Sequence, residues 1–129
     1  MGLQSFNELA PINQGITLNN ASGTANVELT NQGMPVWRVD QIIVVSTDSA
    51  SRVMRLLWHT ASAALLLGSA TIPAGAGTAA APSIDLIQAI AVFAGRGIDL
   101  PAGDYLMVAM ESAITSPLTI VVVAMGGTL

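Results

Sequence analysis

The stretch VWRVDQIIVVST, residues 36–47, decides the fold class. Apolar and polar residues alternate in its first half, and residues 42–45 are apolar without interruption. A period of two places successive side chains on opposite faces of a sheet, and β-branched and aromatic residues suit that pleated surface. The stretch therefore predicts a strand that is exposed on one face at its start and covered on both faces at its end.

The sequence that follows is interpreted as the second strand of a β-hairpin. Residues 46–51 form a short polar connector, and residues 52–59 read RVMRLLWH. Methionine, arginine and leucine favour helix, but the connector length and residue types favour a hairpin. This interpretation places Trp37 and Trp58 on adjacent strands.

Further strands are predicted on both sides of this pair. Short alternating pieces occur at residues 16–18 and 27–29, and longer strands are expected at 64–72 (with a bulge at Gly68), 97–100, 105–111 and 118–125. A Pro-Ala-Gly turn follows two of these strands, and we expect 105–111 to pair with or near 97–100 across the second turn. The number of short strands predicts an all-β fold, an antiparallel, jelly-roll-like β-sandwich.

One short helix is predicted within this all-β pattern, near residues 83–91. Ser83 is placed to cap its first turn, and Asp85 is placed favourably within that turn. Ile84, Ile87 and Ala91 recur at helical spacing and form one apolar face.

The length of 129 residues suits a single domain. We expect an N-terminal arm at residues 1–14 and one β-sandwich domain at residues 15–129. Apolar residues recur at every third position of the arm, and they are predicted to contact a neighbouring subunit: Leu3, Phe6, Leu9 and Ile12. A loosely packed terminus without that contact is the alternative.

The composition restricts the classes of partner. Hydrophobic residues make up 52% of the chain and charged residues only 9%, against about 25% charged residues in typical domains. Such a surface is expected to be covered by another protein or by copies of this one. With four arginines and no lysine, no cluster is available to neutralise phosphates, so we expect no nucleic-acid partner and no polybasic membrane contact.

Other local patterns give little indication of a catalytic or membrane function. The start MGLQSF lacks the features of a signal peptide, and the uncharged stretch at residues 56–84 is interrupted by glycines and a proline, so no membrane span is expected. The chain has no cysteine, which rules out disulfides and thiolate chemistry. Residues 75–80 match G-x-G-x-x-A, but Pro82 delays the helix that a dinucleotide site would need, so a flexible loop is favoured.

Three candidate chemical residues have ordinary structural explanations. His59 is the single histidine, and an ordinary hydrogen bond is favoured over a catalytic role. Asp99 and Asp104 flank a turn, and a turn-stabilising role is favoured over calcium binding. We therefore expect no enzyme activity, no catalytic residue, no metal and no cofactor.

Trp37 and Trp58 complete the set of candidate interface residues. Core packing is the favoured role for both, but a tryptophan exposed at a sheet edge or face is a natural anchor for a protein partner.

Six strand-and-turn segments carry a resemblance to a known family. They are VVSTD at 44–48, LLLG at 65–68, TIPAG at 71–75, IDL at 84–86, LPAGDY at 100–105 and VVVAMGG at 121–127. Together they resemble small virion proteins of tailed bacteriophages. The resemblance implies a jelly-roll-like sandwich on the outer capsid surface, acting as a decoration or cement protein. It implies bridging of neighbouring major capsid subunits by a dimer or trimer. Two alternatives remain, a tail, neck or fibre-base structural protein and a carbohydrate-binding jelly-roll module.

Overall fold

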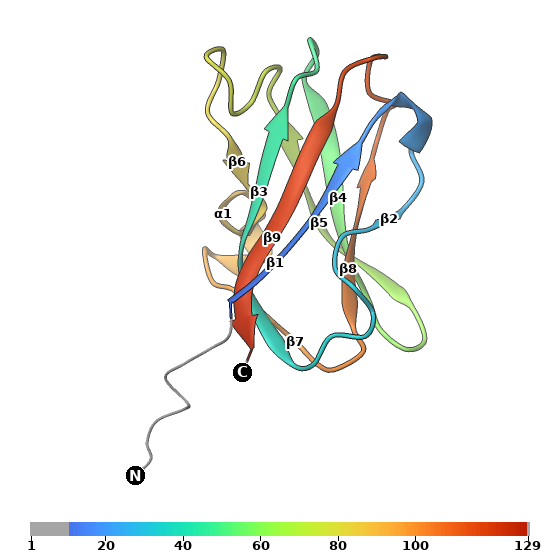
Figure 1. Cartoon of the computed structure of the whole chain (residues 1–129), viewed down its shortest axis with the longest axis vertical. Helices are drawn as coiled ribbons and strands as arrows, with labels where there is room; N and C mark the ends of the chain where they lie inside the picture. The colour runs from blue at the N-terminus through green and yellow to red at the C-terminus, as the bar shows by residue number, and fades with distance from the viewer. Residues whose placement is uncertain (1–10, 129) are drawn as a thin grey trace.

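The computed structural model describes residues 11–128, which form two antiparallel sheets packed face to face (Figure 1). Sheet A has five strands in the order β1-β9-β3-β6, with β7 also paired to β3. Its strands are β1 (Pro11–Leu18), β3 (Trp37–Ser46), β6 (Ile84–Asp85), β7 (Ile98–Leu100) and β9 (Ile120–Thr128).

Sheet B has four strands in the order β2-β8-β4-β5. They are β2 (Val27–Glu28), β4 (Arg52–His59), β5 (Ala64–Ile72) and β8 (Tyr105–Met110). In both sheets strands far apart in the sequence are neighbours, such as β1 beside β9 and β2 beside β8. The first four strands alternate between the sheets, as in a jelly roll. The predicted all-β sandwich is confirmed.

The core lies between the two sheets and is apolar. On β3 the buried side chains alternate as predicted, at Trp37, Val39, Ile42 and Val44. The alternation shifts at a bulge between Val39 and Gln41, where β3 changes its register against β9. β9 buries alternate side chains beside β3 in sheet A in the same manner, and β4 supplies apolar side chains that face them from sheet B.

Two predicted strand pairings are wrong, because the chain crosses between the sheets at both places. β3 lies in sheet A and β4 in sheet B, so residues 46–51 are a crossing connector and not a hairpin turn. Trp37 and Trp58 accordingly lie in different sheets. The hairpin partner of β4 is β5, joined by a turn in which Thr60 N–H donates to the Ala63 carbonyl at 2.9 Å. In the same way β7 pairs with β3 and β8 pairs with β4 and β2.

The predicted short helix is present, but it begins later than expected. α1 spans Leu86–Ala89, and a single 3₁₀ turn, η3, follows at Ala91–Phe93. Its cap is Asp85 and not Ser83: Asp85 Oδ1 accepts from Ile87 N–H and also from Ile42 N–H in β3, both at 3.0 Å. One carboxylate therefore caps the helix and attaches it to sheet A. A second 3₁₀ turn, η2, lies at Asn20–Ser22.

The structure differs from the expected division between arm and domain at residues 11–14. Residues 11–14 belong to β1, which pairs with β9 along its whole length. Pro11 is tolerated because it is the first residue of an edge strand. The predicted arm residues Leu3, Phe6 and Leu9 lie outside the described residues. Within residues 11–128, no helix has the length and apolar character needed to cross a membrane.

Candidate protein-interaction surface

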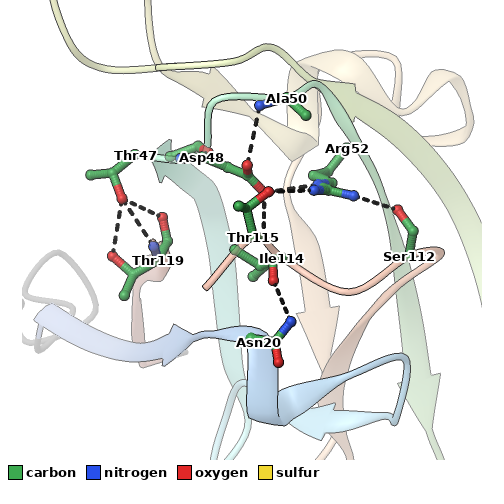
Figure 2. A network of polar contacts seen from close by, with 10 residues as sticks. Asn20, Thr47, Asp48, Ala50, Arg52, Ser112, Ile114, Thr115 and Thr119 are labelled. Carbon is green, nitrogen blue, oxygen red and sulfur yellow. Dashed lines mark hydrogen bonds and ion pairs between the residues drawn. The ribbon is translucent and has the colours of Figure 1, made fainter. Parts of the chain in front are cut away.

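The crossing connector between β3 and β4 is organised around the carboxylate of Asp48, whose side chain is 0% exposed (Figure 2). Oδ1 accepts from Ala50 N–H at 3.1 Å, and Oδ2 accepts from Thr115 N–H at 3.2 Å and from Arg52 Nε at 2.8 Å. Burial alone would raise the pKa of Asp48, but these hydrogen bonds, with that from Arg52 foremost, outweigh it and lower the pKa to about 2.

The guanidinium of Arg52 extends the network to the chain that precedes β9. Its two terminal nitrogens donate to Ser112 Oγ at 3.1 Å and to Thr115 Oγ1 at 2.8 Å. Because each polar group has a partner, the network holds two connections together at one end of the sandwich. Its chemistry is that of a structural clamp.

A shallow hollow of about 340 Å³ lies beside this clamp. It is lined by Asn19, Asn20, Ala21, Ser116, Pro117 and Thr119. The amide of Asn20 is engaged with the Ile114 carbonyl at 2.8 Å. No ionisable side chain lines the hollow, which offers neither a general base nor a charged ligand.

An apolar surface lies at the β5 edge of sheet B. Leu65 is 52% exposed and Leu66 is 59% exposed, and Val92, in the η3 turn that contacts β5, is 67% exposed. We call these three residues the β5 patch. In Figure 1 the end of the β4–β5 hairpin projects from the body of the sandwich, at the lower right. Leu65 and Leu66 are successive strand residues and point to opposite faces of sheet B, so this edge exposes apolar side chains on both faces, which is typical of interaction sites.

β5 is also an edge strand with little protection against pairing. It is the last strand of sheet B, and its sequence ALLLGSATI contains no charged residue and no proline. Proteins usually protect such edges with lysine, proline or a bulge. The protection here consists of a register shift that leaves Leu67 without a partner on β4 and of the packing of Ile90 against Gly68. The edge therefore presents backbone donors and acceptors beside exposed leucines.

The outer face of sheet A is apolar in its middle, while exposed polar residues such as Asn13, Thr17 and Arg38 lie around that middle. Its middle is formed by half-buried side chains from β3 and β9, namely Ile43, Val45, Val121, Val123 and Met125. Gly15 of β1 stands opposite Val123 and adds no side chain. An antiparallel sheet with one free face normally carries polar residues on that face.

The candidate chemical residues each have a nearby structural partner. His59 stacks on Tyr105, with ring centroids 4.6 Å apart and planes at 14°. Asp104 accepts from Trp58 Nε1 at 3.0 Å. Asp99 accepts from Arg38 Nε at 2.7 Å, and the hydrogen bond from Arg38 lowers the pKa of Asp99. Across residues 11–128 no three His, Cys, Asp or Glu side chains are grouped so that they could hold a metal ion.

Of the three predicted interface residues that the structure describes, Trp37 lies in the core and two pack against it. Trp37 is 0% exposed, which leaves none of its side chain for a partner. Trp58 and Ile12 are partly buried and pack against the core of their own domain. Sequence reasoning missed the β5 patch. The signal was available in Leu65-Leu66-Leu67, because successive residues of a strand point to opposite faces and a run of leucines in a sandwich therefore places at least one of them on the outer face.

Comparison with protein families, with curated proteins and with solved structures found no match for this chain. The class that fold and surface define is an antiparallel, jelly-roll-like β-sandwich with an apolar sheet face and an open apolar edge.

Proposed function

We propose that the chain is a structural virion protein that decorates or cements a tailed-bacteriophage capsid by bridging neighbouring major capsid subunits. The observation that carries the proposal is the apolar outer face of sheet A, at Ile43, Val45, Val121, Val123 and Met125. A face of this kind is stable in water when another protein covers it. The sparse charge of the chain, 9% of residues, and the strand-and-turn resemblance described above support the same proposal.

The mechanism is physical. A protein that binds only the assembled shell stabilises that shell by mass action. A specific interface buries about 1,600 Å² in total, and many identical contacts around a shell act together. The β-sandwich supplies a rigid body whose apolar face retains its shape when it docks. The clamp at Asp48 and Arg52 contributes by fixing the connections at one end.

The test uses heads of the phage that encodes this chain, prepared without it. Purified protein is expected to co-sediment with these heads and to raise the temperature at which they release DNA. Val123→Asp should reduce the affinity at least about tenfold by placing a charge in the covered face. Asn13→Asp is the matched control, because Asn13 is exposed on the same face and already polar.

Two results would contradict the proposal. One is equal binding of the wild type and Val123→Asp to the heads, with both proteins folded by circular dichroism. The other is binding to isolated tails in place of heads, which would favour the tail, neck or fibre-base alternative. The carbohydrate-binding alternative would need exposed aromatic rings on which a sugar can stack. Neither tryptophan supplies one, since Trp37 is buried and Trp58 packs against the core.

The predicted arm residues are tested separately. Deleting residues 2–10 removes Leu3, Phe6 and Leu9 and leaves β1 complete from Pro11. We expect the truncated chain to fold and to bind heads more weakly. Unchanged head binding by this variant would exclude an anchoring role for these three residues.

A further inference from the structure

The β5 edge presents two kinds of complementarity at once. Along its backbone it offers donors and acceptors that match another extended strand, since among residues 11–128 only β4 pairs with β5. Beside the backbone it offers the exposed side chains of Leu65, Leu66 and Val92. A partner that fits both must be an extended, uncharged strand with apolar side chains.

The charge distribution indicates which strand that is. The chain carries a net charge of −4, yet no charged residue occurs between Arg55 and Asp85. Two copies can therefore bring their β5 edges together without placing like charges opposite each other. The apolar side chains of one edge then meet the same apolar side chains of the other, which makes the edge complementary to itself under a two-fold axis.

We propose that β5 pairs antiparallel with β5 of a second copy, so that the two four-stranded B sheets join into one continuous sheet across a symmetric dimer. The axis lies toward the hairpin end of the strand, at residues 64–67, because Ile90 packs against Gly68 farther along. The β5 patch of each copy is covered by its counterpart. This inference deepens the proposed function, on which its role in a virus particle rests, by naming the partner of one surface.

The size of the contact sets the expected affinity. Pairing about an axis within residues 64–67 joins only the hairpin end of β5, about 13 Å of strand, so it buries much less than a standard interface of about 1,600 Å². The dimer is therefore expected to dissociate measurably on dilution, with a dissociation constant on the order of micromolar.

The first experiment is sedimentation equilibrium of the purified chain without any head. The wild type is expected to be dimeric at tens of micromolar, about tenfold above that constant. Leu66→Lys should raise the dissociation constant at least about tenfold, because a charge at an edge opposes pairing. Val36→Lys is the matched control, since Val36 is also an exposed apolar residue, 43% exposed, and precedes β3. A monomeric wild type, or equal effects of the two variants, would overturn the inference.

The second experiment locates the contact without a destabilising charge. The chain has no cysteine, so single substitutions give unambiguous cross-links. A disulfide needs Cα atoms within about 7 Å of each other, so only a cysteine close to the two-fold axis can link to its own copy. Of the single variants Ala64→Cys and Leu66→Cys, the one nearer the axis is expected to form a disulfide-linked dimer under mild oxidation, and Thr17→Cys on the edge strand β1 is expected to remain monomeric on a denaturing gel. Cross-linking through β1 alone would overturn the inference.

The outcomes distinguish this inference from the proposed function. Dimers linked through β5 that bind no head would leave this inference standing and contradict the proposed function. Head binding by a chain that is monomeric in solution would support the proposed function and overturn this inference. It would then favour a strand of another protein as the partner of the β5 edge.

Discussion

Arg52 Nε donates to Asp48 Oδ2 at 2.8 Å, and the side chain of Asp48 is 0% exposed while that of Arg52 is 16% exposed. The carboxylate also accepts two backbone N–H bonds, from Ala50 and Thr115. A buried charge is tolerated only when it is paired and fully hydrogen-bonded, and Asp48 meets both conditions. The pair lies where the chain passes from sheet A to sheet B, so it holds the connector between β3 and β4 in the conformation that joins the two sheets.

Asp48→Asn is expected to lower the free energy of unfolding by about 2–3 kcal/mol, because it removes the charge that Arg52 faces and one acceptor of the cluster. Urea denaturation of the purified variant measures this loss. Asp99→Asn is the control, because the Asp99–Arg38 pair is about half exposed on both sides and exposed pairs contribute little. Equal losses in the two variants would contradict a special role for the buried pair.

The same pair predicts a dependence of stability on acid. The pKa of Asp48 is about 2 in the folded chain, against an ordinary value of 3.8. A lowered pKa means that the folded state binds the proton less readily than the unfolded state. The contribution of Asp48 is therefore complete above about pH 5 and is lost as the pH falls toward 2.

Comparison of the wild type with Asp48→Asn isolates this effect. The difference between their free energies of unfolding should be constant above about pH 5 and should shrink as the pH falls through the window from 4 to 2. Asp99, whose pKa is also lowered, is present in both proteins and cancels in the difference. A difference that stays constant down to pH 2 would contradict the assignment.

The periodicity of the sequence was sufficient to predict the strands, and it failed at the connections between them. Residues 37–46 form a strand because their alternation is local and strong. The polar connector at 46–51 has the composition of a hairpin turn, but the long-range contacts from Asp48 to Thr115 and from Arg52 to Ser112 define a crossing. No local pattern contains those partners, which are 67 and 60 residues away along the chain.

The sequence predicted a surface poor in charge, but it did not predict which strands carry that surface. Low charge indicated a surface covered by protein, and the structure has an apolar sheet face and an apolar edge. Trp37 and Trp58 were candidates for interface residues because aromatic residues are enriched at interfaces. Trp37, however, is buried in the core. Which leucines of β5 face outward depends on the bulge at Leu67 and on β5 being the last strand of its sheet. Both facts require the assembled sheet.

The contact between Trp58 and Asp104 links β4 to the turn that precedes β8, with Nε1 and Oδ2 at 3.0 Å. Trp58→Phe keeps most of the ring packing and removes the donor. We expect a loss of about 1–2 kcal/mol, typical of a partly buried hydrogen bond to a charged acceptor. A double-mutant cycle with Asp104→Ala measures the pair directly. A coupling energy near zero would show that the two side chains contribute independently.

The last prediction concerns Gly126, where β9 crosses the bulge of β3. A Cβ atom added at Gly126 would overlap the carbonyl oxygen of Arg38 and approach the Cα of Val39 at 3.1 Å. The obstacle is backbone in a paired strand, so it cannot be relieved by a side-chain rotation. Gly126→Ala is therefore expected to destabilise the fold by at least about 3 kcal/mol, the upper range for overpacking.

Gly33→Ala is the matched control for this substitution. Nothing lies within 4 Å of a Cβ added at Gly33, so the same change of residue should alter the free energy of unfolding by less than about 1 kcal/mol. Thermal and urea denaturation of both variants decide the question. If Gly126→Ala unfolds at the same urea concentration as Gly33→Ala, β9 must be able to move away from the bulge, and the tight pairing of β9 with β3 at this point would be refuted.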